Sequence, residues 1–153
     1  MQPAMMRDRN GQLTFYWNVD SPVGLNGMNK FEDVLFVQWC FYKITKWNHS
    51  RLPIDFRSNL GKAGVNGSCT GREDDPLVGS IKAVQDKFHL VVDGRVDPPT
   101  SDYYIHHGER QRYFIFYLNA VLRALHPQQY PRIDLMPEFI WRIKDKAIAP
   151  FIY

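Results

Sequence analysis

The chain of 153 residues lacks several features that would place it in a familiar class of protein. Its two cysteines, Cys40 and Cys69, are too few for a disulfide framework. No apolar run reaches the roughly 18 residues that a membrane-spanning helix needs. The first twelve residues hold no apolar stretch of the kind that an export signal requires. We therefore expect no membrane span and a chain that is cytoplasmic as synthesised, with delivery to the periplasm or cell envelope as the alternative.

The chain also lacks a strong charge of either sign. Its formal net charge is +3, and the excess lies in residues 104–153, which hold seven basic and four acidic residues. Nucleic-acid binding usually needs a concentrated basic stripe, so we expect no nucleic-acid partner. Cys40 falls within an apolar helical segment and Cys69 within a glycine-containing loop. Buried free thiols are therefore the main interpretation, and a single bridge between them is the alternative.

Recognisable catalytic motifs are missing as well. The sequence has no G-x-S-x-G, no phosphate-binding loop and no Cys-His nucleophile pairing. Glu73, Asp74 and Asp75 are read as helix-capping residues rather than as paired catalytic carboxylates. The five histidines form no pattern of metal ligands; they are His49, His89, His106, His107 and His126. We therefore predict no enzyme activity, no metal and no cofactor, with Glu109 the carboxylate to test first.

Residues 75–100 carry the clearest local signals of secondary structure in the chain. Asp75 and Pro76 are typical of a helix start, because Asp accepts from free amides and Pro tolerates the first helical position. Leu77, Ile81, Val84 and Phe88 then follow at helical spacing and predict one buried face. Asp93-Gly94 predicts a tight turn, because glycine adopts the positive φ that such a turn needs.

A second helix is expected upstream, starting at Asn29, where Asn29 and Glu32 have the spacing of a capping box. Apolar residues surround nearly the whole of this helix through residue 47, which indicates a central, buried element. Val37-Gln38-x-x-Phe41 recurs as Val84-Gln85-x-x-Phe88, and this repeat suggests a pair of related helices. Each glutamine is expected to hold an adjacent turn rather than to contact a ligand.

The flanking segments are less distinctive. Residues 1–12 are expected to be loose, and residues 13–19 to form a short strand or an ordered extended segment. A third helix is expected over residues 109–125, ending at His126-Pro127. A last short helix is expected over 138–147, with Phe139, Ile140 and Ile143 facing inward. Residues 48–64 read as an insertion in a long connection.

The sequence pattern A-V-Q-x-x-F followed by D-G-x-V-x-P-x-T resembles the second half of a domain of the peptidoglycan-binding-like family. The upstream S-P-V-G, G-x-N and D-V-x-x-V-Q pattern supplies a first half, so the resemblance covers about residues 21–104. The matching residues in the second half are Ala83, Val84, Gln85, Phe88, Leu90, Asp93, Gly94, Val96, Pro98 and Thr100. Asn66 stands where the family's first turn usually has Asp, and residues 101–108 intervene before the third helix.

The resemblance implies a mainly α fold: a three-helix peptidoglycan-binding-like core at 21–104 with an extra C-terminal helical segment at 105–153, in a single domain. It implies a non-catalytic module that binds peptidoglycan at the bacterial cell wall. The alternative is a protein–protein adaptor, accessory or immunity-like component of a bacterial secretion or phage apparatus. Polar and aromatic residues flanking the turns are the candidate ligand-binding set. They are Arg72, Asp93, Arg95, Asp97, Tyr103 and Tyr104.

Overall fold

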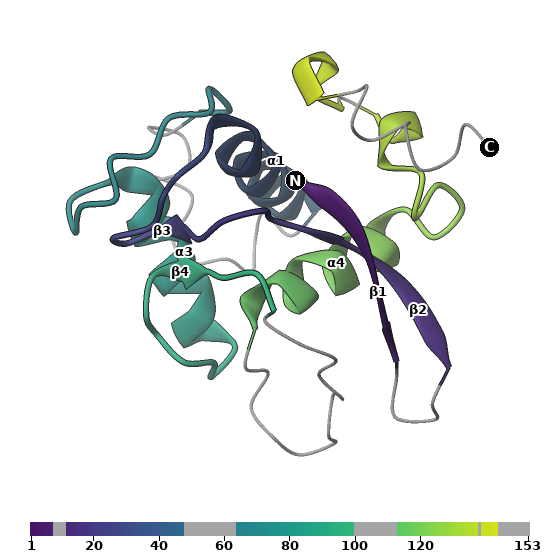
Figure 1. Ribbon diagram of the computed structural model, residues 1–153, viewed down its shortest axis with the longest axis horizontal. Coiled ribbons are helices and arrows are strands. Elements are labelled where there is room, and N and C mark those ends of the chain that lie inside the picture. Colours follow the sequence, from purple (N-terminus) through teal and green to yellow (C-terminus); the bar gives the residue numbers. More distant parts are fainter. Residues whose placement is uncertain (8–11, 48–63, 100–112, 138, 144–153) are drawn as a thin grey trace.

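The computed structural model describes residues 1–7, 12–47, 64–99, 113–137 and 139–143 (Figure 1). The described part holds three helices, α1 (Phe31–Trp47), α3 (Pro76–Lys87) and α4 (Phe114–Leu125). It also holds two antiparallel sheets of two strands each, and two 3₁₀ turns, η1 (Ile133–Leu135) and η2 (Trp141–Ile143). The prediction of a mainly α three-helix core with an extra helical segment is therefore wrong, because the fold mixes helices with sheet.

The larger sheet pairs β1 (Gln2–Arg7) with β2 (Leu13–Asn18), with Gln2 opposite Asn18 and Arg7 opposite Leu13. The strand expected at 13–19 is confirmed, and its Trp17 is fully buried. The loose segment expected at 1–12 is wrong for residues 2–7. Strand β1 has little β-branched or aromatic character of its own, so the pairing with β2 is what makes it a strand.

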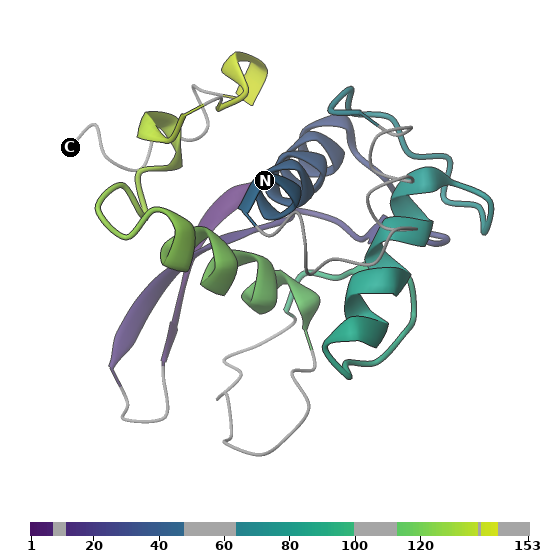
Figure 2. The same cartoon turned by 180° about the vertical axis from the view of Figure 1, so that it is seen from behind.

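Strand β2 is attached to α4 by the side chain of Asn119. The Trp17 amide donates to Asn119 Oδ1 (2.7 Å), and Asn119 Nδ2 donates to the Trp17 carbonyl (2.8 Å). The Tyr130 hydroxyl also donates to Asn119 Oδ1 (2.9 Å). This amide therefore takes the place that a neighbouring strand would take, and it satisfies backbone groups that burial would otherwise leave unpaired. Figure 2 shows α4 between the hairpin and α3.

Helix α1 is the central element, as its all-round apolar character predicted, and its residues from Val34 to Phe41 are buried. Its predicted start is wrong, because the helix begins at Phe31 rather than Asn29. Asn29 adopts a left-handed φ of 50°. Its side chain accepts from the Gly24 amide (2.7 Å) and donates to the carbonyls of Gly24 (3.1 Å) and Gly27 (3.0 Å). The asparagine thus holds the loop before the helix.

Helix α3 begins as predicted. The Leu77 amide donates to Asp75 Oδ1 (2.8 Å), and Pro76 is the first helical residue. Leu77, Ile81 and Val84 are buried on the face that their spacing indicated. Phe88, expected on the same face, is instead 43% exposed, because the helix ends at Lys87. Its ring packs at 4.7 Å from that of Tyr117 on α4.

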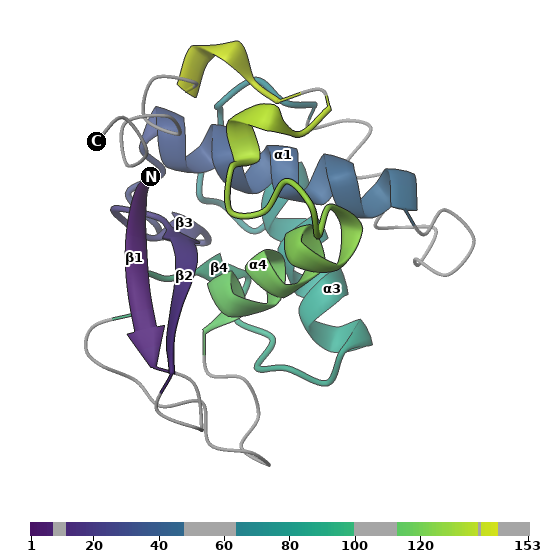
Figure 3. The same cartoon turned by 90° about the vertical axis from the view of Figure 1, so that its right-hand side faces the viewer.

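The third predicted helix is confirmed from Phe114 to its end, where His126 is the C-cap. The last predicted helix is present, within the described residues, only as the 3₁₀ turn η2; Ile143 is buried there. Figure 3 shows the C-terminal turns lying over α1. Trp39 meets Phe139 edge to face at 5.0 Å, which holds this segment on the helix.

The small sheet joins the loop before α1 to the segment after α3. It pairs β3 (Val23–Gly24) with β4 (Arg95–Val96), so Gly24 lies opposite Arg95. The Leu25 amide also donates to the Gly94 carbonyl (3.0 Å). None of the helices in the described part of the chain has the length and apolar character needed to cross a membrane.

Candidate functional site

The site is built on two turns, of which the first (residues 65–69) is held by Gln38 of α1. Gln38 is fully buried, and its Oε1 accepts from the amides of Asn66 (2.9 Å) and Gly67 (2.8 Å). Its Nε2 donates to Asn66 Oδ1 (3.2 Å) and to the Ser68 carbonyl (3.0 Å). The Ser68 amide closes the turn on Asn66 Oδ1 (2.9 Å). One buried amide therefore satisfies the polar backbone of a whole turn.

The second turn (residues 92–96) is held in the same way by Gln85 of α3. Gln85 Oε1 accepts from the amides of Asp93 (3.1 Å) and Gly94 (2.9 Å). Its Nε2 donates to Asp93 Oδ1 (2.8 Å) and to the Arg95 carbonyl (3.1 Å). The Arg95 amide closes this turn on Asp93 Oδ1 (2.9 Å). Gly67 and Gly94 have φ values of 79° and 71°, which glycine adopts most readily.

The repeat seen in the sequence is therefore a repeat of hydrogen bonding, and the structural role predicted for both glutamines is confirmed. The surroundings of the two turns differ. An added Cβ at Gly67 would collide with the ring of Phe31, which lies against the first turn. The second turn instead borders a pocket. The two turns thus share one pattern of hydrogen bonds, but the ring of Phe31 covers the first turn, whereas the second turn borders the pocket.

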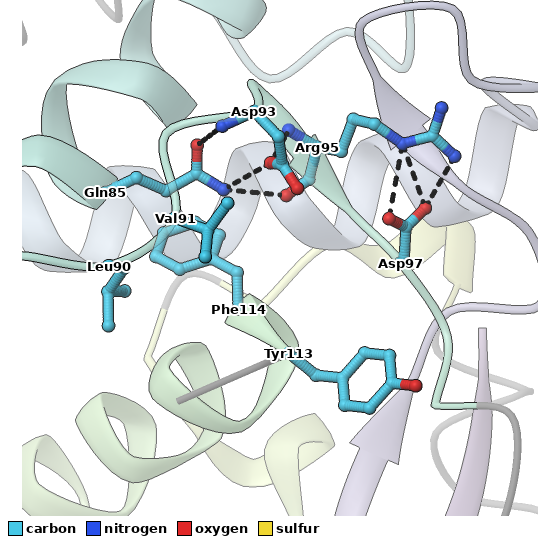
Figure 4. Close-up of a pocket in the computed structure, with 8 residues that line it drawn as sticks. All are labelled: Gln85, Leu90, Val91, Asp93, Arg95, Asp97, Tyr113 and Phe114. Atoms are coloured by element: carbon cyan, nitrogen blue, oxygen red, sulfur yellow. Dashed lines mark hydrogen bonds and ion pairs between the residues drawn. The ribbon is translucent and has the colours of Figure 1, made fainter. Parts of the chain in front are cut away.

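The pocket lies between the second turn and the start of α4 (Figure 4), and the space inside it is about 10 Å³, enough for one water-sized group. Its polar side is formed by Gln85 and the charged residues of the turn and β4. Its apolar side comes from the loop after α3 and from α4. The residues lining it are Gln85, Leu90, Val91, Asp93, Arg95, Asp97, Tyr113 and Phe114.

Arg95 and Asp97 form the strongest charged contact in the pocket. Arg95 Nη2 lies 2.7 Å from Asp97 Oδ1, and Nε lies 3.2 Å from both carboxylate oxygens. Nη1 reaches the Leu25 carbonyl at 3.4 Å, which links β4 to the loop after β3. The hydrogen bonds to Asp97, opposed by burial and reinforced by the charges of Asp97 and Asp93, raise the pKa of Arg95. The guanidinium is therefore a permanent charge that Asp97 neutralises.

Three of the six predicted ligand-binding residues, Asp93, Arg95 and Asp97, meet at this pocket. Arg72 is not among its lining residues; its side chain is exposed and lies 3.4 Å from Asp74. Tyr103 and Tyr104 lie outside the described residues.

Sequence reasoning missed the apolar half of the pocket. Leu90 belonged to the resemblance, but nothing in it marked Leu90 as part of a site. Tyr113 and Phe114 were expected within the third helix, and periodicity alone does not say that the start of this helix faces the second turn. The apolar residues Leu90 and Val91 directly before an Asp-Gly turn were the available signal.

The residues considered for catalysis have other roles where the structure describes them. Asp75 caps α3, Glu73 Oε2 lies 2.5 Å from Lys82 Nζ, and no group of three potential metal ligands occurs among the described residues. His49, His106, His107 and Glu109 lie outside those residues.

Both cysteines are free thiols, as expected in the main interpretation. Burial raises the pKa of Cys40 well above its usual value. Cys69 is only half-buried, yet burial is also the main reason that its pKa rises to about 11. A thiol with a raised pKa is a poor nucleophile near neutral pH, so neither cysteine is activated.

Comparisons of the chain with protein-family models, with curated proteins and with solved structures found no match. The site's geometry and the sequence resemblance are therefore what a functional proposal rests on.

Proposed function

We propose that the chain is a non-catalytic module that binds peptidoglycan at the bacterial cell wall, through the pocket beside the second turn. The observation that carries the proposal is the pair of glutamine-held turns, one of which borders a pocket. The resemblance to peptidoglycan-binding-like domains rests on the same residues, since Gln85, Asp93 and Gly94 belong to the matched pattern. The sequence resemblance and the hydrogen bonding therefore point to the same place in the chain.

The pocket's chemistry also supports this ligand. Peptidoglycan offers sugar faces, amides and charged peptide groups, and a site for it needs apolar surface beside a few fixed polar groups. Tyr113 supplies aromatic surface on one side, with the buried ring of Phe114 behind it. The second turn supplies polar groups that Gln85 holds in place. A site with fixed polar groups loses less conformational entropy when a ligand binds.

Co-sedimentation with purified sacculi tests the proposal. At moderate salt the protein is expected to pellet with sacculi in a saturable manner, and to stay in solution without them. A protein that remains wholly in the supernatant would contradict the proposal. The same incubation tests the non-catalytic part, because soluble muropeptides are not expected to appear. Their release, abolished by Glu109→Gln, would show that the chain is a hydrolase.

The second candidate is an adaptor, accessory or immunity-like component of a secretion or phage apparatus, acting through protein–protein contacts. The exposed apolar residues of the loop after α3 favour it: Phe88, Val91 and Val92 are 43%, 53% and 49% exposed. Such apolar surface is typical of protein contact sites when it is contiguous. A protein partner captured with the wild-type chain and lost with Val92→Lys, without retention on sacculi, would favour this candidate over wall binding.

A further inference from the structure

We infer that the pocket beside the second turn accepts a primary ammonium group carried on an aliphatic stem, rather than a carboxylate. The inference rests on the proposed function and names the part of the ligand that enters the pocket. The peptide stems of peptidoglycan include a diamino acid, whose side chain offers an amino group on an alkyl chain. The argument depends on the charges and the apolar residues that line the pocket.

Arg95 is a poor anchor for a ligand carboxylate. Three contacts of 2.7 to 3.2 Å join its guanidinium to Asp97, and Nη1 is directed to the Leu25 carbonyl. Asp97 is only two residues further along the chain, directly after β4, so its effective concentration at Arg95 is very high. A ligand carboxylate would have to displace it. The Arg95–Asp97 pair thus contributes no net charge to the pocket.

Asp93 gives the pocket a net negative charge. Its Oδ1 accepts from Gln85 Nε2 (2.8 Å) and from the Arg95 amide (2.9 Å), which fixes the carboxylate in one orientation. Lys82 also reaches this turn, because an added Cβ at Gly94 would meet its side chain, but Lys82 is paired with Glu73. Among the described lining residues, two carboxylates therefore face one guanidinium. A cation is the ligand charge that this arrangement attracts.

The apolar side of the pocket suits the stem that carries such a cation. Leu90, Val91 and Phe114 line it, and Val91 is 53% exposed at its mouth. Lysine-like chains bury their methylene groups along apolar surface while the ammonium keeps polar contacts. An alkyl stem lying on the exposed side chain of Val91 and on Leu90 would direct its ammonium to Asp93. This combination of surfaces distinguishes an alkylamine from a free carboxylate or a neutral amide.

The first turn supplies the variant that isolates the charge of Asp93. Asn66 occupies the equivalent position and makes the equivalent hydrogen bonds with Gln38 and with the Ser68 amide. Asp93→Asn therefore keeps the turn and removes only the negative charge. The reciprocal variant, Asn66→Asp, adds a charge at the turn that Phe31 covers, and it serves as the matched control.

The test is a titration of the ¹⁵N-labelled chain with three blocked tripeptides, and binding is monitored through the chemical shifts of the backbone amides. The peptides are acetyl-Ala-Lys-Ala-amide, the same peptide with an acetylated lysine side chain, and acetyl-Ala-Glu-Ala-amide. We expect the lysine peptide alone to shift amides in residues 85–97 and 113–114. Asp93→Asn is expected to weaken that binding about tenfold, because a charged hydrogen bond is lost. Asn66→Asp is expected to leave it unchanged.

Equal binding of the acetylated or the glutamate peptide, or unchanged affinity in Asp93→Asn, would overturn the inference. Its failure is separable from failure of the proposed function. Retention on sacculi without a response to the lysine peptide removes the amine inference and leaves wall binding. A response to the lysine peptide without retention on sacculi leaves an amine pocket and removes wall binding.

Discussion

Gln38 and Gln85 are buried polar side chains that each hydrogen-bond to an adjacent turn, so each pairs backbone groups that would otherwise be left without a partner. Gln38→Leu keeps the side-chain size but leaves the amides of Asn66 and Gly67 without their acceptor. We expect the free energy of unfolding to fall by about 3 kcal/mol, the cost of several unmade hydrogen bonds to buried groups. Urea denaturation measures this change.

The control for that experiment is Gln128→Leu, because Gln128 is exposed in the turn after α4. A surface change of this kind is expected to alter the free energy of unfolding by less than about 0.5 kcal/mol. Equal effects of the two substitutions would mean that Gln38 does not hold the first turn.

Asp75 gives a prediction about pH. Burial opposes ionisation of its carboxyl, but hydrogen bonds from the Thr70 amide and hydroxyl and from the Leu77 amide outweigh burial and lower its pKa. A lowered pKa in the folded state stabilises the fold above the unfolded pKa of about 3.9. That stabilisation is lost as the pH falls through the lower folded value.

Asp75→Asn tests this prediction, since Asn also caps helices well but does not titrate. The wild type is expected to exceed the variant in free energy of unfolding at pH 7, and the difference is expected to shrink as the pH is lowered to about 3. Urea denaturation across that range is the measurement. A difference that stays constant with pH would show that the charge of Asp75 contributes nothing to stability.

The hairpin of β1 and β2 depends on α4, because two strands alone are marginally stable in water. Asn119→Leu removes the side chain that pairs with the Trp17 amide and carbonyl. We expect it to lower the free energy of unfolding by about 3 kcal/mol, whereas Tyr130→Phe, which removes hydrogen bonds at the edge of the same cluster, costs about 1 kcal/mol. Hydrogen exchange is expected to show faster exchange of the β2 amides in Asn119→Leu. Unchanged protection there would contradict this role.

The helices could be predicted from the sequence because their signals are local. Asp75 and Pro76 mark a helix start, and the apolar residues around α1 repeat along the chain. The hairpin and its attachment depend on residues far apart in sequence: Asn119 lies 102 positions from Trp17. No residue pattern in residues 1–7 predicts a strand, because this segment becomes a strand by pairing with β2, which follows later in the chain. Tertiary pairing therefore decided the elements that local propensity did not.

For the molecule as a whole, three candidate residues were predictable because the Asp-Gly turn places Asp93, Arg95 and Asp97 within a few residues of one another. The other side of the pocket was not predictable, because it requires the start of α4 to lie against the loop after α3. The polar half of the pocket is therefore predictable from residues that are close in sequence, whereas the apolar half depends on tertiary packing.

We have proposed that peptidoglycan is bound at the second turn and not elsewhere on the fold. Val91, directly before the second turn, is 53% exposed, and Val65, the first residue of the first turn, is 37% exposed; of the two, only Val91 lines the pocket. Val91→Lys places a cation at the pocket mouth and removes apolar surface, while Val65→Lys makes the same change at the first turn. Comparing their retention on sacculi with that of the wild type is the most direct measurement. We expect Val91→Lys to lose retention by about tenfold or more, the effect of about 1.4 kcal/mol, and Val65→Lys to bind like the wild type. Equal retention of all three proteins would contradict binding at the second turn.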